Sequence, residues 1–320
     1  MPDVLCLGII VADLVAKPVT GLPPRGGLKL VDSIQLHNGG CAVNTATALA
    51  KLGFTAAVSG MVGNDGLGQV LIDNLVKAGV DTRYILKTDQ AGTSVSMVLV
   101  DSSGERSFIH YTGANALLQA ADFNATSLAD TRILHIAGSL LMPGFDGEPC
   151  AAVLKTAKSR GLMTTLDTAW DDTGRWMKAI GPCLPYVDIF IPSLAEARML
   201  TGLEDLSEIA RVFLDHGVKT VVIKLGADGC YIQTRDASYH IPGFKVRAVD
   251  ATGAGDCFVA GFLAGVLQGL PANRCGLLAN AVGAMSVTSV GAATGVKSLT
   301  ETFAFMNSSI EIQEGQQWQR

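Results

Sequence analysis

The run TVVIKL, residues Thr220–Leu225, is the last of four short apolar segments that decide how the middle of the chain folds. The other three are Ile133–Ala137, Met163–Asp167 and Val187–Ile191. Each has the length and composition of a buried strand. The segments with helical spacing of apolar residues that separate them lie near Gly147–Arg160, Leu194–Thr201 and Ser207–His216. Strands that alternate with helices predict an α/β fold with a doubly wound, mostly parallel sheet flanked by helices.

A smaller β element is predicted in the N-terminal part of the chain. Val4–Val11 indicates the first buried strand, but Leu28–Leu36 alternates only in part, as a strand with one exposed face does. Ser94–Val100 and Arg106–Tyr111 form an expected hairpin around a turn at 101–104. We therefore expect a single domain over residues 1–320, with a β-sheet lid formed by about residues 13–38 and 93–112.

Composition excludes several kinds of partner. The 320 residues carry 24 Lys and Arg against 29 Asp and Glu, a net charge of -5, and contain no basic block. A nucleic-acid or anionic-membrane partner is therefore not expected. The seven Cys are scattered without a C-x-x-C pair, which argues against a zinc site or disulfides and favours the cytoplasm. The longest apolar run, Cys257–Leu267, is too short to span a bilayer.

The segment Asp250-Ala251-Thr252-Gly253-Ala254-Gly255-Asp256 stands directly before an apolar helix. Small residues at 253–255 allow a sharp turn whose N–H groups point outward at a helix N-terminus, which is an anion-binding arrangement. A carboxylate beside such a site suits proton removal from a hydroxyl group that attacks a phosphoryl group. The alternative interpretation is that Asp256 only caps its helix.

A second segment, Asn38-Gly39-Gly40-Cys41-Ala42-Val43-Asn44, lies where the pattern changes from strand to helix. Its two glycines let a ligand approach the backbone closely. The amide of Asn44, on an otherwise small and apolar helix, offers a donor and an acceptor to sugar hydroxyls. Taken alone, a tight turn followed by a core Asn explains the segment equally.

Together the two segments resemble the signatures of the ribokinase family, also called the phosphofructokinase B family of carbohydrate kinases. The N-terminal signature matches residues 39–53, and the C-terminal signature matches Asp250–Asp256. Val62–Gly68, with Gly79–Thr82 downstream, is also typical of this family. The resemblance spans nearly the whole chain, and implies ATP, Mg²⁺ and K⁺ as cofactors and dimerisation through the lid.

The resemblance also implies roles for individual residues. The catalytic base is Asp256, and the anion hole is Gly253, Ala254 and Gly255. The substrate contacts are Asp13, Gly39, Gly40 and Asn44. The nucleotide contacts are Lys224, Gly226, Gly229 and Asn280. The positions near a monovalent cation are Asp250 and Thr252, with carbonyl groups supplied by the loop Val287–Gly295.

Two positions depart from the family pattern. The family usually carries Asn-x-x-Glu for phosphate and magnesium, and here Ser193 replaces the Asn while Glu196, expected to bind Mg²⁺ through water, is kept. Sugar-acid kinases of the family often have an Arg shortly after a strand-end Asp, and Asp167–Asp171 contains none. An anionic substrate is therefore less expected at that point. Arg106 is a candidate to reach the substrate from the lid, or else a surface residue.

We expect an ATP-dependent sugar kinase that transfers the γ-phosphate to a primary hydroxyl of a small carbohydrate, with Asp256 as the general base. Two alternatives are a nucleoside kinase of the same fold and a sugar-binding sensor without catalysis. The choice of sugar depends on lid side chains and on residues near Gly138, Ser139 and Asp167.

Overall fold

The computed structural model describes residues 2–102, 105–123, 128 and 131–317. Its main element is a nine-stranded sheet in the order β13-β12-β11-β10-β9-β8-β1-β4-β5. All neighbouring strands pair in parallel except β11–β12 and β12–β13, which are antiparallel. The predicted doubly wound, mostly parallel sheet is therefore confirmed. The strands are β1 Val4–Gly8, β4 Ala56–Gly63, β5 Asp81–Thr88, β8 Ile133–Ser139, β9 Met163–Thr168, β10 Ile189–Phe190, β11 Thr220–Lys224, β12 Cys230–Gln233 and β13 Ser238–Ile241.

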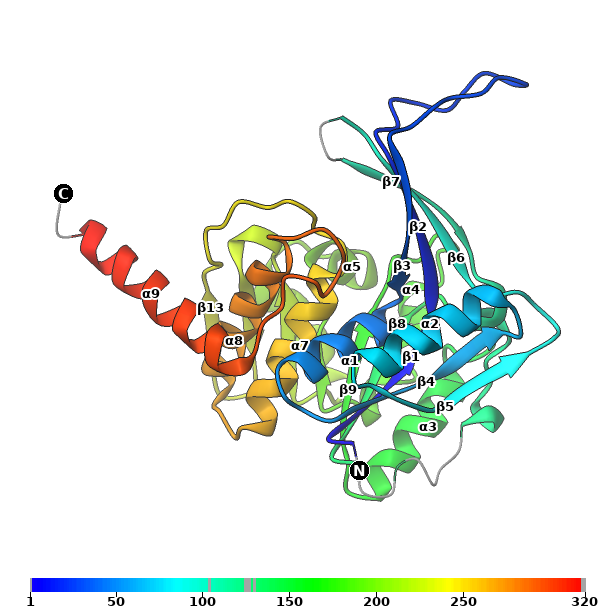
Figure 1. The fold of residues 1–320 in the computed structure, drawn as a ribbon. Helices are drawn as coiled ribbons and strands as arrows, with labels where there is room; N and C mark the ends of the chain where they lie inside the picture. The colour runs from blue at the N-terminus through cyan, green and yellow to red at the C-terminus, as the bar shows by residue number, and fades with distance from the viewer. Residues whose placement is uncertain (1, 103–104, 124–127, 129–130, 318–320) are drawn as a thin grey trace.

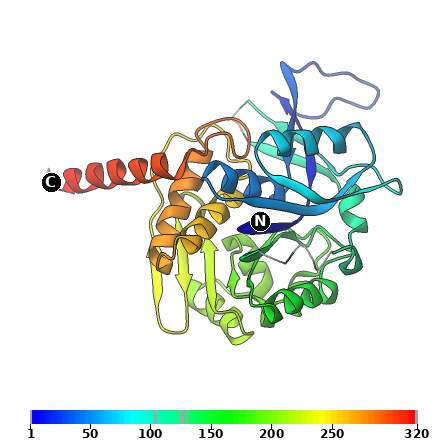
Figure 2. The ribbon, with the colours of Figure 1, turned by 60° about the horizontal axis from the view of Figure 1, so that its bottom comes forward.

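Helices cover both faces of this sheet (Figures 1 and 2). One face packs against α1 Cys41–Lys51, α2 Gly66–Lys77, α7 Ala254–Leu267 and α8 Ala272–Ser286. The other packs against α3 Glu148–Ser159, α4 Trp176–Ile180, α5 Leu194–Thr201 and α6 Leu206–Asp215. The last helix, α9 Leu299–Gln317, packs on α8 and extends away from the sheet (Figure 1). In β1, Val4 and Cys6 belong to the first core, and Leu5 and Leu7 to the second. Burial on both faces explains why the strands are almost continuously apolar. No helix among the described residues is long and apolar enough to cross a membrane.

A second, four-stranded sheet stands apart from the main one (Figure 1). Its order is β3-β2-β6-β7, and its strands are β2 Val11–Lys17, β3 Ser33–Gly39, β6 Val95–Val100 and β7 Arg106–Tyr111. β2 pairs with β6 in parallel, and the other pairs are antiparallel. The two stretches predicted to form the lid, about residues 13–38 and 93–112, thus come together in one small sheet. Residues 103–104 of the expected turn lie outside the described residues.

The prediction of one strand over Val4–Val11 is wrong, because the chain passes from one sheet to the other at Ile9–Ile10. The side chain of Asn115 forms hydrogen bonds with both backbone groups of Ile10, in place of a neighbouring strand. Its Oδ1 accepts from the Ile10 N–H at 3.2 Å, and its Nδ2 donates to the Ile10 carbonyl at 3.0 Å. A distant side chain therefore ends the strand, and Asp13 lies within β2 of the small sheet instead of ending β1.

The strand expected at Leu28–Leu36 begins only at Ser33. Its partner β2 ends at Lys17, which pairs with Ser33, and the next residue, Pro18, has no N–H to continue the ladder. Leu28 and Leu30 lie in the connecting loop and are more than 80 % exposed. The strand β5 and the hairpin β12–β13 at the two edges of the main sheet were not predicted from the sequence.

Candidate active site

The N-terminus of α7 places Asp256 on the first helical turn. Gly253, the residue directly before the helix, has φ 66°, a conformation that favours glycine. A Cβ at Gly253 would also lie 2.5 Å from the Cβ of Ala292, so the turn packs closely on the loop before α9. Within the described residues, no side chain caps this helix. Its positive end is therefore available to an anion.

Asp256 is buried, with 9 % of its surface exposed, and it is tied to α1. Asn44 Nδ2 donates to Asp256 Oδ2 at 2.8 Å, and Thr45 Oγ1 donates to the Asp256 carbonyl at 3.3 Å. Burial raises the pKa of Asp256, and the hydrogen bond from Asn44 and the charge of Lys224 offset part of that rise. A raised pKa brings the carboxyl group closer to the value that suits a general base near neutral pH.

Asp256 lines a cavity of about 1110 Å³ that lies between the small sheet and the main one. Asp13, Gly40 and Asn44 also line it. Gly39 lies directly against the carboxyl group of Asp13: a Cβ on Gly39 would lie 2.0 Å from Asp13 Oδ2, so this position has no room for a side chain. The structure thus brings Asp13 together with the sugar-contact positions predicted in the segment 38–44.

Asp13 has an unusual electrostatic environment. Its pKa is raised to about 6 by burial and by the nearby charges of Asp256 and Asp250, while a hydrogen bond with Ser96 opposes the rise. Asp13 lines the cavity, and a carboxyl group there can accept hydrogen bonds from hydroxyl groups.

The other walls of this cavity come from the small sheet and from the loop after β9, where the sequence placed the choice of sugar without assigning individual contacts. Phe108 and His110 reach it from β7, and Trp170 and Arg175 reach it from the loop after β9. Arg175 also donates through Nη2 to Asp146 Oδ2 at 3.1 Å. The segment Asp167–Asp171 contains no Arg, but Arg175, four residues further along the chain, lines the cavity.

A second cavity, of about 460 Å³, lies on the other side of the α7 N-terminus. Its walls include Ala254, Gly255, Lys224, Gly226 and Gly229. Asn280 from α8 lines it too, but its Nδ2 donates to the carbonyls of Ile241 and Pro242 at 3.0 and 3.1 Å. Asn280 therefore holds the wall of this cavity in place. The predicted nucleotide positions thus gather here, except for Ser193 and Glu196.

Lys224, at the end of β11, lines the smaller cavity. Its Nζ lies 2.7 Å from Asp167 Oδ1 at the end of β9; the Asp167 side chain is 2 % exposed and that of Lys224 is 12 % exposed. Burial alone would lower the pKa of Lys224, but the charges of Asp167 and Glu196 outweigh it and raise that pKa. A Cβ on Gly255 would lie 3.5 Å from this ammonium group. The fixed positive charge thus stands at the anion site of α7.

Ser193 and Glu196 form a capping box at the start of α5. The Ser193 hydroxyl accepts from the Glu196 N–H at 3.3 Å, and Glu196 Oε2 accepts from the Ser193 N–H at 2.8 Å. Thr168 Oγ1 also donates to Glu196 Oε2 at 2.9 Å. Ser and Asn are similarly good N-cap residues, so Ser193 preserves the local backbone and the orientation of Glu196.

Arg106 does not line either cavity described above. Its Nη1 lies 3.5 Å from Asp250 Oδ1 and donates to the Thr252 hydroxyl. The structure therefore places it beside the two residues expected at the monovalent-cation position, and not beside the predicted sugar contacts.

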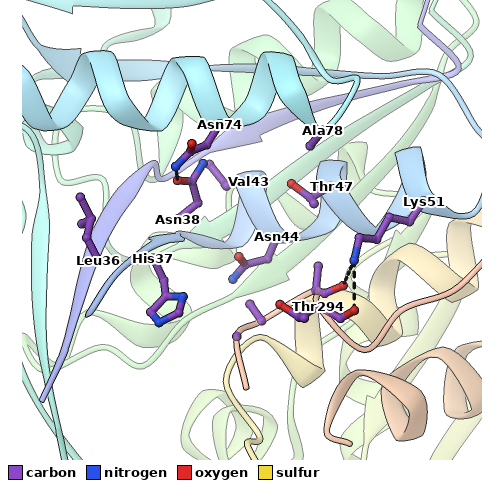
Figure 3. A pocket seen from close by; sticks show the side chains of 13 residues that line it. Leu36, His37, Asn38, Val43, Asn44, Thr47, Lys51, Asn74, Ala78 and Thr294 are labelled. Atoms are coloured by element: carbon purple, nitrogen blue, oxygen red, sulfur yellow. Dashed lines mark hydrogen bonds between the residues drawn. The ribbon is translucent and has the colours of Figure 1, made fainter. Parts of the chain in front are cut away.

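A third cavity, of about 290 Å³, is lined by Asn44 together with residues of β3, α1, α2 and the loop before α9 (Figure 3). Asn38 of β3 accepts from Asn74 Nδ2 of α2 at 2.9 Å along one wall. On the opposite wall Lys51 Nζ donates to the carbonyls of Ala293 and Thr294 at 2.8 and 3.1 Å. The first contact joins the small sheet to α2, and the second joins the loop before α9 to α1.

Comparisons with known proteins extend over nearly the whole chain. The sequence model of the pfkB family carbohydrate kinase group matches residues 1–299. The ribokinase of Haemophilus influenzae is 30 % identical over 306 residues, 94 % of this chain and 97 % of that protein. The 2-dehydro-3-deoxygluconokinase of Bacillus subtilis is 29 % identical over 301 residues, 90 % of this chain and 92 % of that protein. An E. coli protein assigned as ribokinase II, solved with ATP and Mg²⁺, has a TM-score of 0.84 at 26 % identity, with 96 % and 100 % of the two chains covered.

Proposed function

Because the chain belongs to the pfkB family of carbohydrate kinases, we propose that it transfers the γ-phosphate of ATP to a primary hydroxyl of a small carbohydrate. One observation carries this proposal: the N-terminus of α7 lies between two cavities. Asp256 lines the larger cavity, and Ala254 and Gly255 line the smaller one. A phosphoryl group held at this helix end is within reach of a hydroxyl group in the larger cavity.

In this mechanism the sugar binds in the larger cavity. Asp13 accepts hydrogen bonds from its hydroxyl groups, and Asn44 holds Asp256 in position. Asp256 removes the proton of the attacking hydroxyl as the bond to the γ-phosphorus forms and the bond to the leaving oxygen of ADP breaks. The amides at 253–256 and the Lys224 ammonium stabilise the charge that spreads over the phosphoryl oxygens.

The residues at the start of α5 fit a hydrated Mg²⁺. This ion is usually held by one or two carboxylates together with water and phosphate oxygens. Glu196 is such a carboxylate, and its Oε2 is oriented by Ser193 and Thr168. Bound there with ATP, Mg²⁺ neutralises phosphate charge.

The proposal is tested by ADP release in a coupled assay with MgATP and a panel of pentoses, hexoses, sugar acids and nucleosides. We expect one class of carbohydrate to raise ADP release far above the rate without acceptor, and ³¹P NMR to show a phosphomonoester product. A panel without any phosphorylated product, although ATP binds, contradicts the proposal. Tight sugar binding with no turnover would then identify a sensor.

A nucleoside kinase is the second candidate, because the larger cavity offers aromatic surface as well as room. Trp170 and Phe108 line it and are 53 % and 58 % exposed. Such rings can stack on a base. Preference for nucleosides over free sugars in the same panel selects this candidate.

We also propose that the small sheet mediates a homodimer. Its outer face is apolar: Leu14 pairs with Leu36 and Met97, and Met97 pairs with Ile109. Three of these side chains, Leu36, Met97 and Ile109, are 38–52 % exposed, together with Ile34 beside them. Contiguous apolar surface of this kind is typical of an interaction site. A second copy of the chain offers a matching face through two-fold symmetry.

The dimer predicts a solution mass of about twice the 33.3 kDa of one chain, as measured by light scattering after size exclusion. We expect Met97→Lys, which places a charge at the centre of this face, to yield monomers. The control is Met199→Lys on α5, which is similarly exposed but lies outside the small sheet. A wild-type monomer at micromolar concentration contradicts the proposal.

A further inference from the structure

Two basic side chains hold the loops that lead into the anion hole. Arg106 of β7 binds Asp250 and Thr252, and Lys51 of α1 binds the loop at 293–294. We propose that these residues are the built-in cations of this site, so that phosphoryl transfer needs no monovalent metal ion. The inference rests on the proposed kinase function for its activity test. It replaces the expectation that Asp250 and Thr252 lie beside bound K⁺.

The carboxylate of Asp250 is already well supplied with donors. Its Oδ1 accepts from the Thr252 N–H at 2.9 Å and from the Thr252 hydroxyl at 2.6 Å, and lies 3.5 Å from Arg106 Nη1. Its Oδ2 accepts from the Gly291 N–H at 2.9 Å. The charge of this carboxylate is thus stabilised without a metal ion.

Thr252 and three carbonyl groups of the expected ligand loop also have hydrogen-bond partners. The Thr252 hydroxyl donates to Asp250 and accepts from Arg106. The Val287 carbonyl accepts from the backbone N–H groups of 249 and 250 at 2.7 and 3.1 Å. The carbonyls of Ala293 and Thr294 accept from Lys51 (Figure 3). A potassium ion bound to Asp250 Oδ1 and the Thr252 hydroxyl would have to displace the Arg106 guanidinium, which already occupies this place with its own positive charge. These two positions therefore do not fit the ion.

The position of Arg106 explains why this charge matters for the reaction. Asp250 and Thr252 directly precede the anion hole, and Gly291, which donates to Asp250, lies next to Ala292, against which Gly253 packs. The orientation of these loops therefore sets the direction of the amides at 253–256. Arg106 is a positioning residue, because it acts on the phosphoryl group through the turn before α7.

Arg106 also links the anion hole to the sugar cavity. Its guanidinium lies 5.8 Å from the ring centroid of Phe108, two residues along the same face of β7, and Phe108 lines that cavity. The same residue thus connects the small sheet, the sugar and the turn before α7. A metal ion in its place would lack this covalent link to the small sheet.

The first test measures kcat in KCl, NaCl and tetramethylammonium chloride at equal ionic strength. We expect the wild-type values to agree within about twofold. Arg106→Met should lower kcat by about a hundredfold, because the turn is no longer held. Added guanidinium or K⁺ should restore part of this loss. The matched control is Arg83→Met, which removes an exposed arginine paired with Asp81 on β5 and should leave kcat unchanged.

The second test does not depend on kinase activity. The melting temperature of the ligand-free wild type should be the same in KCl and NaCl, whereas that of Arg106→Met should be higher in KCl. If no acceptor is phosphorylated, the proposed function fails, and this comparison still decides the present inference. If Arg106→Met does not fold, the wild-type salt series decides it alone. A wild type that is activated tenfold or more by K⁺, or stabilised by K⁺ over Na⁺, overturns it.

Discussion

Replacing Asp256 by asparagine is expected to lower kcat by about a thousandfold, because the attacking hydroxyl loses its general base. The amide has the same shape as the carboxyl group, and its oxygen can still accept from Asn44 Nδ2, now 2.8 Å from Asp256 Oδ2. Because burial raises the pKa of Asp256, removing the charge should not lower the melting temperature. KM for the sugar should change little if Asp13 provides most of the binding.

The measurement is steady-state ADP release together with thermal unfolding of the same preparations. Asp215→Asn, which changes an exposed carboxyl group at the end of α6, is the matched control and should behave like the wild type. A folded Asp256→Asn variant whose kcat stays within tenfold of the wild type contradicts the assignment of Asp256 as base.

Replacing Lys224 by methionine should impair both folding and catalysis. The change leaves Asp167 buried without its partner at 2.7 Å, which is expected to cost about 3–5 kcal/mol of unfolding free energy. It also removes the positive charge beside Gly255, so kcat should fall by about a hundredfold or more. Chemical denaturation and ADP release measure the two effects separately.

The loss of stability in Lys224→Met should depend on pH in a defined direction. Burial already raises the pKa of Asp167, and Lys224 opposes that rise, so the variant should have a still higher value. A carboxyl group whose pKa is higher in the folded than in the unfolded protein makes stability fall as pH rises between the two values. The variant should therefore be closest to the wild type near pH 4 and furthest from it above pH 7. The pKa of Asp256 should also rise, which moves the acidic limb of kcat/KM to higher pH.

Two further variants separate the two roles of Lys224. Lys219→Met removes a comparable ion pair with Asp188 at 2.8 Å, but Lys219 is 70 % exposed, so we expect a loss below about 1 kcal/mol. Combining Lys224→Met with Asp167→Leu should recover most of the stability without recovering activity. An equal loss of stability in the Lys219 and Lys224 variants contradicts the argument from burial.

Local signals in the sequence were sufficient for the parallel strands β8 to β11 of the main sheet and for the motifs at residues 38–44 and 250–256, but not for the edge strands β5, β12 and β13. The predicted helix Leu194–Thr201 has the observed bounds of α5, because Ser193 and Glu196 form its cap within four residues. The turn before α7 was predictable for the same reason, since Gly253 adopts a positive φ and the apolar helix follows at once. In these segments the interactions that select the backbone lie close together in the chain.

Contacts between distant segments decided the rest. The N-terminal strand looked continuous from Val4 to Val11, but Asn115, 105 residues away, takes the backbone groups of Ile10 and divides it. Arg106 was a candidate sugar contact by its place in the small sheet, whereas its partners Asp250 and Thr252 lie 144 and 146 residues away. No local pattern specifies such partners, because they depend on how the two sheets are placed together.

The sequence by itself determined an α/β chain with a separate small sheet, and it predicted an anion hole and a carboxyl base in the turn before α7. Only the tertiary structure decided that Asn44 holds Asp256 across 212 residues, that Lys224 pairs with Asp167, and that an arginine stands beside Asp250 and Thr252. The physical reason is the range of the interactions involved. Spacing and turn chemistry act within a few residues, while the charges and hydrogen bonds of the site join strand ends and loops that meet only after packing.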